Sequence, residues 1–130
     1  MSTEPTTYAI ERSHSFLIVR VMGELMMQAE EFLNRLFWSA DLKPETLATV
    51  HAIIVDVRGT KLSSEGLYLF IGLQTRLHAV RPDGIVAIVC TPESHTEHVL
   101  NNTQLTRIFT TFESVELAIA DLERTLQGRK

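Results

Sequence analysis

Two adjacent serines, Ser63 and Ser64, are the residues of this chain whose type and position point most directly to chemistry. They stand at the start of an apolar stretch with helical character that runs from Ser64 to Val80. A serine at a helix start caps it, because its hydroxyl accepts a hydrogen bond from a backbone N–H of the first turn. The same hydroxyl is a candidate phosphoacceptor, since a phosphate would add about −1.5 to −2 charges to an exposed helix start. From these residues alone, capping and phosphorylation are both open interpretations.

Other residues with chemical potential lack the partners that catalysis or metal binding requires. His95 and His98 stand three positions apart on a predicted helix, a spacing that can place two metal ligands on one face. No third histidine or cysteine ligand lies nearby in the sequence, so two solvated histidines are the favoured interpretation. Neither a glycine-rich phosphate loop nor a nucleophile with its base is recognisable. We therefore predict no enzyme activity, no catalytic residues, no metal and no cofactor.

Bulk properties exclude several classes of partner. The formal net charge is −4 and no Lys/Arg cluster occurs, which argues against nucleic acid. The longest apolar runs fall far below the ~20 residues that span a bilayer, so no membrane insertion is expected. The single cysteine, Cys90, lies in an apolar run, which predicts core packing and a protein of the reducing cytoplasm.

The chain length is that of a single domain, and strands alternate with helices along it. Residues 1–7 are polar and are predicted to form a disordered tail without a secretory leader, and the domain is assigned to residues 8–127. Strands are predicted at residues 8–12, 16–22 (ended by Gly23), 51–57, 85–90 and 107–112. Helices are predicted at residues 28–38 and 64–80, from residue 92, and from the cap Ser114, with a short turn at 44–50. This order predicts an α/β fold with a mixed, mainly parallel four- to five-stranded sheet, an N-terminal antiparallel hairpin and about four helices.

The segment after the third strand is the predicted binding edge. Partners of parallel sheets gather at the carboxyl ends of the strands, and this strand ends at Asp56-Val57. Gly59 would let a partner approach the backbone, Arg58 and Lys61 would face an acidic surface, and Leu67 would point into the core. The predicted partner-binding residues are Asp56, Arg58, Gly59, Thr60, Lys61, Ser63, Ser64, Glu65 and Gly66.

Several motifs, in this order and spacing, resemble the STAS domain of bacterial anti-sigma factor antagonists. Residues 53–59 are similar to that family's hydrophobic strand ending in Asp-Leu-Ser-Gly, and residues 63–67 resemble its Asp-Ser-Ser/Thr-Gly-Leu phosphorylation motif. Residues 23–25 are similar to its Gly-x-Leu. Residues 105–109 and 112–118 are similar to its Gly-Leu-x-x-x-Phe and Phe-x-Ser-x-x-x-Ala.

The resemblance implies a role for one serine. In the family, the serine after the Asp is phosphorylated by a serine kinase that is also the anti-sigma factor. Aligned on Gly66, Ser64 takes the phosphoacceptor position (with Ser63 as the alternative), Ser63 replaces the Asp, and Glu65 replaces the second Ser/Thr. Aligned on Asp56, the loop is one residue short and Glu65 takes that position, where its charge resembles the phosphorylated form. The alignment on Gly66 is preferred, because packing fixes the helix start while a loop tolerates deletion.

The resemblance therefore implies a cytoplasmic bacterial phosphoprotein that regulates transcription. It would bind a serine kinase/anti-sigma factor, and phosphorylation of Ser64 would switch that binding off. The alternative is an unswitched STAS adaptor or scaffold subunit of a signalling assembly or of a transporter ATPase, which Glu65 and the missing Asp favour. A homodimer is compatible with either function.

Overall fold

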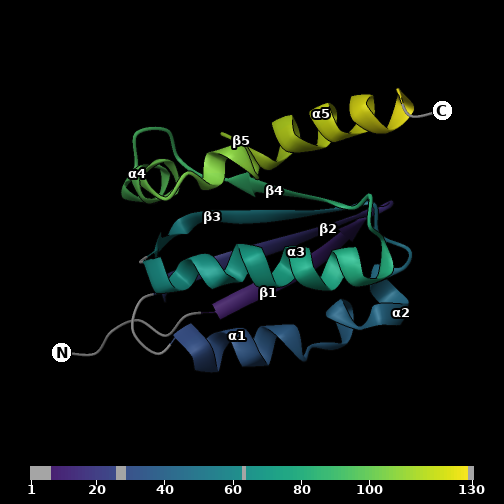
Figure 1. Ribbon diagram of the computed structural model, residues 1–130, viewed down its shortest axis with the longest axis horizontal. Coiled ribbons are helices and arrows are strands. Elements are labelled where there is room, and N and C mark those ends of the chain that lie inside the picture. Colours follow the sequence, from purple (N-terminus) through teal and green to yellow (C-terminus); the bar gives the residue numbers. More distant parts are fainter. Residues whose placement is uncertain (1–6, 26–28, 63, 129–130) are drawn as a thin grey trace.

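A five-stranded sheet forms the centre of the protein (Figure 1). The computed structural model describes residues 7–25, 29–62 and 64–128. The strands follow one another across the sheet in chain order, with β1 antiparallel to β2 and every later pair parallel. The predicted mixed, mainly parallel sheet is therefore confirmed. The strands are β1 (Thr7–Ser13), β2 (Phe16–Leu25), β3 (Ala52–Leu62), β4 (Ile85–Val89) and β5 (Thr110–Phe112).

The predicted N-terminal hairpin is present, but its second strand is longer than expected. Its tight turn places His14 at a φ of 55°. We predicted that Gly23 ends the second strand, and this is wrong: with a φ of 102°, Gly23 lies within β2, which continues to Leu25. Pairing with β3 stabilises this extension, since Gly23 lies opposite Thr60 and Leu25 opposite Leu62.

The third strand is also longer than predicted. The β-branched run before Asp56 is buried on both faces of the sheet, as a central parallel strand should be. The segment after Val57, predicted as a loop, continues as strand to Leu62. A bulge between Arg20 and Met22 shifts the β2–β3 register, after which pairing resumes at Met22 and Gly59. Partner-strand pairing explains the extension, and the local sequence pattern does not reveal it.

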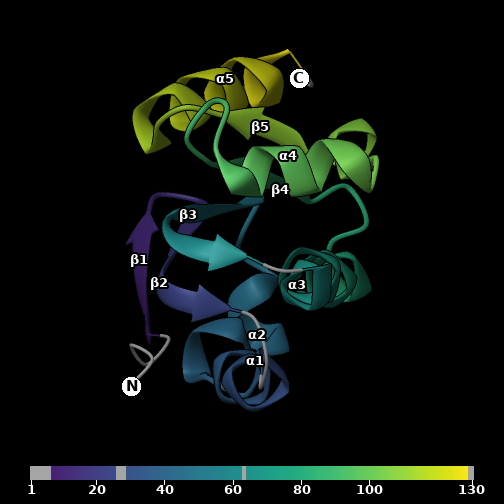
Figure 2. The ribbon, with the colours of Figure 1, turned by 90° about the vertical axis from the view of Figure 1, so that its left-hand side faces the viewer.

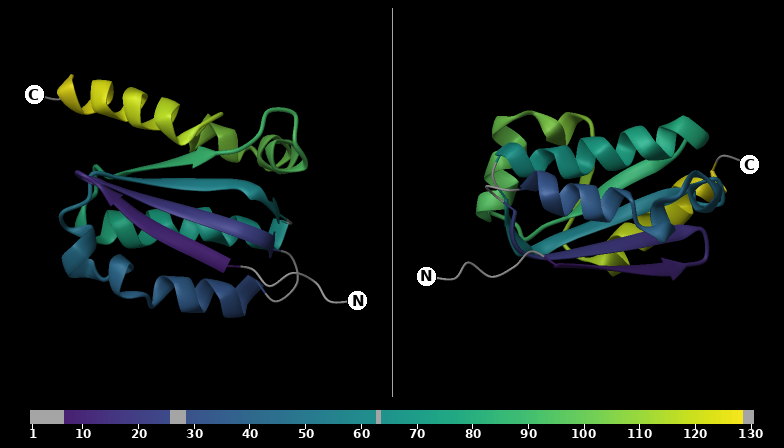
Figure 3. Two further views of the ribbon diagram at one scale, coloured as in Figure 1. Left: turned by 180° about the vertical axis from the view of Figure 1, so that it is seen from behind. Right: turned by 90° about the horizontal axis from the view of Figure 1, so that it is seen from below.

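Helices cover both faces of the sheet (Figures 1 and 3). The first three helices pack on one face and α5 packs on the other. The described residues form one short helix more than the predicted four, at the turn expected after Lys43. The helices are α1 (Ala29–Phe37), α2 (Pro44–Leu47), α3 (Tyr68–Val80), α4 (His95–Asn102) and α5 (Val115–Gln127), with 3₁₀ turns η1 (Ala40–Leu42), η2 (Ser64–Leu67) and η3 (Leu105–Arg107).

Helix starts follow their caps. The Oγ of Ser114 accepts a hydrogen bond from the Leu117 N–H at 3.2 Å, which confirms the predicted cap of α5. The predicted start of α4 at Pro92 is wrong, because Glu93 has a φ of 61° and the Oγ of Ser94 caps the helix by accepting from the Glu97 N–H. The fifth strand starts at Thr110, after η3, and not at Arg107.

Two hydrophobic cores result, one on each face of the sheet. The larger core lies under α1 and α3, and the smaller one joins the other face of the sheet to α5. Directly after α1, the side chain of Trp38 is 81% exposed. Within the described residues, no helix has the length and apolarity needed to span a membrane.

Candidate functional site

The predicted binding segment lies at the carboxyl edge of the sheet, where β2 and β3 end beside the start of α3. Figure 2 views this edge with the arrowheads of both strands toward the reader. Residues 58–62 belong to β3, and Ser64 opens η2, which leads directly into α3. Ser63 lies outside the described residues, and so do the side chains of Lys61, Ser64 and Glu65.

Packing fixes the point at which the chain enters α3. Gly66 is buried, and Leu67, only 6% exposed, belongs to the larger core. The prediction that Leu67 points into the core is confirmed. A fixed helix entry is the premise for aligning the phosphorylation motif on Gly66 and hence for choosing Ser64.

Asp56 is buried and holds Arg58 by three hydrogen bonds. The Nε of Arg58 donates to Oδ1 at 3.0 Å, its Nη2 donates to Oδ2 at 2.8 Å, and its backbone N–H donates to Oδ1 at 3.1 Å. Burial alone would raise the pKa of Asp56, but the hydrogen bonds and charge of Arg58, with the charge of Arg20, lower that pKa below its ordinary value. Arg58 was predicted to face an acidic partner surface, and in the fold its guanidinium is paired with Asp56.

Two further charged residues, missed by sequence reasoning, extend this network across the sheet. The Nη1 of Arg20 lies 3.5 Å from Oδ2 of Asp56, and its Nε donates to Oε1 of Glu11 at 2.8 Å. Arg20 and Asp56 are cross-strand partners in the β2–β3 register. The β2–β3 register could have identified the Arg20–Asp56 pair, but the sequence does not show which strands become neighbours in the sheet.

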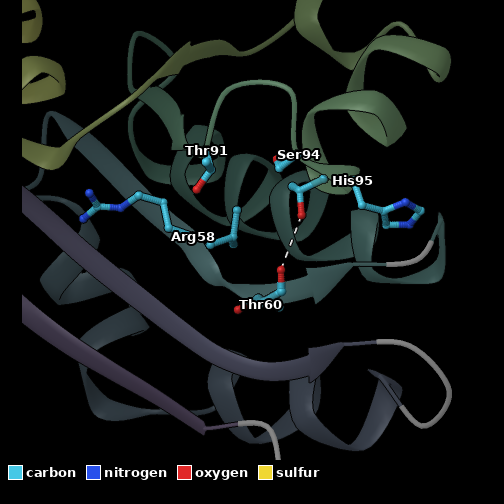
Figure 4. A pocket seen from close by; sticks show the side chains of 7 residues that line it. Arg58, Thr60, Thr91, Ser94 and His95 are labelled. Carbon is cyan, nitrogen blue, oxygen red and sulfur yellow. Dashed lines mark hydrogen bonds between the residues drawn. The ribbon is translucent and has the colours of Figure 1, made fainter.

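A small pocket lies between β3 and the start of α4 (Figure 4). It has a volume of about 150 Å³. The Oγ1 of Thr96 donates to the Thr60 carbonyl at 3.4 Å, and the Oγ1 of Thr60 donates to the Val21 carbonyl at 2.6 Å. These two bonds tie α4 to β3 and β3 to β2. The lining residues are Val57, Arg58, Thr60, Thr91, Ser94, His95 and Thr96.

The pocket presents hydroxyl groups rather than a reactive pair. In Figure 4 the Arg58 guanidinium and the His95 imidazole point away from each other, on opposite sides of the pocket. The hydrogen bonds of the lining hydroxyls run to backbone groups, namely the carbonyls of Val21 and Thr60 and the Glu97 N–H. Thr91, Ser94 and Thr96 were not predicted as site residues, because they come from the loop and helix after β4.

The remaining candidate residues do not assemble a metal site or a reactive thiol. Across residues 7–25, 29–62 and 64–128, no group of three or more His, Cys, Asp or Glu side chains is placed to hold a metal ion. Cys90 is buried as predicted, and burial, with the nearby charge of Glu97, raises the pKa of its thiol to about 11. A neutral buried thiol packs as a small apolar group.

Two apolar side chains are exposed on the first turn of α3, next to the site. Tyr68 is 64% exposed and Ile71 is 42% exposed. They directly follow the predicted segment, since α3 begins where η2 ends. Exposed large apolar side chains beside a strand-edge site are typical of protein contact surfaces.

Comparison with known proteins shows the same fold. An anti-sigma factor antagonist from Mycobacterium paratuberculosis has a TM-score of 0.66 at 19% identity, with 92% of this chain and 95% of that chain covered. The unphosphorylated anti-sigma factor antagonist SpoIIAA has a TM-score of 0.65 at 20% identity, covering 90% and 96%. The phosphorylated Bacillus cell fate determinant SpoIIAA gives 0.57 at 22% identity, covering 89% and 99%.

Sequence comparison assigns the family. A search of curated protein sequences gives no match. The family model of the STAS domain matches residues 7–118, which include every strand and the site. The chain therefore belongs to the STAS domain family.

Proposed function

We propose that this protein is an anti-sigma factor antagonist whose binding to a serine kinase/anti-sigma factor is switched off by phosphorylation of Ser64. The observation that carries the proposal is the position of Ser64 at the start of η2, at the carboxyl edge and directly before α3. Structures of SpoIIAA, to which this chain is similar in fold, have been solved in phosphorylated and unphosphorylated forms. That similarity supports phosphorylation as the means of regulation in this chain too.

The surface around Ser64 explains how a phosphate would act. The first eight residues of α3, from Tyr68 to Thr75, include no charged side chain, and Tyr68 and Ile71 are exposed. The docking surface, defined here as Ser64, Tyr68 and Ile71, therefore presents two exposed apolar side chains from α3. Phosphorylation would place about −1.5 to −2 charges beside it. A partner that buries this surface would have to desolvate the phosphate, so binding weakens.

The fold beneath the docking surface resists this added charge. Gly66 and Leu67 are buried, and Thr60 ties the end of β3 to β2. A helix start also tolerates a nearby anion, because its free N–H groups and dipole favour negative charge. The switched quantity is therefore affinity, and the fold is retained.

Phosphorylation with a matched serine control tests the proposal. The full chain is incubated with ATP and a serine kinase/anti-sigma factor encoded in the same genome, and its intact mass is measured. We expect a gain of about 80 Da, one HPO₃ group, in wild type and in Ser63→Ala, and no gain in Ser64→Ala. The phosphorylated chain should then bind the kinase at least about tenfold more weakly than the unphosphorylated chain.

Two results would contradict the switch. A mass gain that persists in Ser64→Ala would move the phosphoacceptor elsewhere, with Ser63 as the first alternative. If Ser64→Asp binds the same partner with unchanged affinity, charge at this position has no effect. The chain would then be the unswitched adaptor or scaffold subunit, which Glu65 in place of the second Ser/Thr of the motif also favours.

A further inference from the structure

The outer edge of β1 is an unpaired sheet edge. This strand is terminal in the sheet, and among the described residues no further strand pairs with it. Figure 2 shows β1 at the margin of the molecule, with β2 on one side and no helix or strand on the other. Unpaired N–H and C=O groups on such an edge are a template for another strand.

The usual protections of an exposed edge are missing or engaged elsewhere. The strand contains no proline or lysine, and its seven residues pair with β2 without a bulge. Its two charged residues are used within the chain. Glu11 accepts from Arg20 at 2.8 Å, and the Arg12 guanidinium donates to the carbonyls of His14 and Thr49 at 2.7 and 3.0 Å.

The sequence of β1 is complementary to itself in one antiparallel register. When two copies pair about Ile10, all seven residues find a partner and Ile10 lies opposite Ile10. Arg12 then lies opposite Tyr8 and Glu11 lies opposite Ala9, so that no two like charges face each other. Shifting the centre to Glu11 would oppose two like charges, and shifting it to Ala9 would leave Arg12 and Ser13 without partners in the strand.

We propose that this protein forms a symmetric homodimer by antiparallel pairing of its β1 edges about Ile10. The two sheets then become one continuous sheet, and the two-fold symmetry closes the assembly at two copies. The opposite edge cannot extend it in the same way, because β5 has only three residues. Both docking surfaces stay accessible, since α3 lies on the side of the molecule away from the β1 edge (Figure 2). The proposal is independent of phosphorylation and of any kinase.

Native mass and paired cysteines test the dimer and its register. Sedimentation of the full chain, from micromolar to millimolar concentration, should show a shift from 14.7 kDa toward twice that mass. Ala9→Cys and Glu11→Cys place thiols at exposed positions that face each other only between copies. An oxidised mixture of the two variants should give a cross-linked dimer, while each variant alone should not, because its thiols are too far apart. Cys90 is buried and does not interfere.

Each alternative result overturns the proposal. A mass of 14.7 kDa at every concentration excludes the dimer. A dimer that the mixed cysteines fail to cross-link uses another surface. Cross-linking of Ala9→Cys alone, or of Glu11→Cys alone, assigns a register centred on Ala9 or on Glu11 instead of Ile10. Circular dichroism confirms that each variant is folded before it is scored.

Discussion

At the residue scale, Asp56 is a carboxylate kept charged although it is buried. Arg58 supplies three hydrogen bonds to it, and Arg20 adds a second positive charge. Because the pKa of Asp56 is lowered in the fold, its stabilising contribution is complete above its ordinary pKa of 3.8. That contribution is lost as the pH falls through the lowered value.

Replacing Arg58 should therefore cause a pH-dependent loss of stability. In Arg58→Met the Asp56 carboxylate loses its side-chain donors, and burial then raises its pKa. The free energy of unfolding should fall by about 1 kcal/mol at pH 7, a modest value because Arg58 is partly exposed and its charge is screened. Urea unfolding at neutral pH and below pH 3.8 should show the difference shrinking in acid.

Arg124→Met is the matched control, since Arg124 pairs with Asp121 on an exposed helix surface. Its effect should stay within about 0.5 kcal/mol. If the loss for Arg58→Met were equal at both pH values, it would come from packing alone. The Asp56–Arg58 pairing was not predicted because Arg58 was assigned to a loop, whereas it lies in β3, where residues two positions apart share a face.

At the element scale, α3 packs tightly against α1 at a glycine. A Cβ added at Gly72 would lie 2.3 Å from Cζ of Phe37. The guanidinium of Arg76 covers the Phe37 ring, with its Cζ 4.6 Å from the ring centroid. Figure 3 shows the two helices side by side from below. The absent side chain at this position lets the two helices approach.

Adding a methyl group there should separate the helices. Gly72→Ala gains helix propensity worth up to about 1 kcal/mol, but overpacking against Phe37 costs about 1–3 kcal/mol. We expect a net loss of about 1 kcal/mol in the free energy of unfolding, partly restored in the double variant with Phe37→Leu. The control is Gly128→Ala, where the added Cβ meets only ordinary contacts at 3.6 Å. Equal effects of the two alanines would show that the close approach carries no strain.

The ends of the elements mark the limit of what the sequence could predict. The local pattern of apolar residues predicted every strand and every longer helix, because an element buried on one or both faces has apolar residues at characteristic spacings. Residues 58–62 were mistaken for a loop, because a polar stretch with Gly59 becomes strand only when β2 continues beside it. The pocket was missed for a similar reason, since α4 reaches β3 only in the folded chain.

At the scale of the whole molecule, α5 is the one helix among the described residues that covers the second face of the sheet. Its inward residues are Val115, Ala118 and Leu122, and they pack on the smaller core. Leu122 is 3% exposed, whereas Leu117 on the same helix is 54% exposed. The second core therefore depends on few side chains.

The same substitution at two positions of α5 should separate burial from helix propensity. Leu122→Ala should lower the free energy of unfolding by about 2–4 kcal/mol, because it leaves a cavity between helix and sheet. Leu117→Ala should change it by less than about 0.5 kcal/mol. Urea unfolding followed by far-ultraviolet circular dichroism measures both. Similar losses in the two variants would contradict the assignment of the inward face.

The exposure of Trp38 has a consequence for how this protein can be observed. It is the only tryptophan in the chain, and its indole already lies in water in the folded state. Its fluorescence should therefore be emitted at long wavelength and be quenched readily by iodide before any unfolding takes place. Denaturation would change this signal little, so tryptophan emission is a poor monitor of folding here. A partner that covers the end of α1 would shift the emission to shorter wavelength and would be detected without any label.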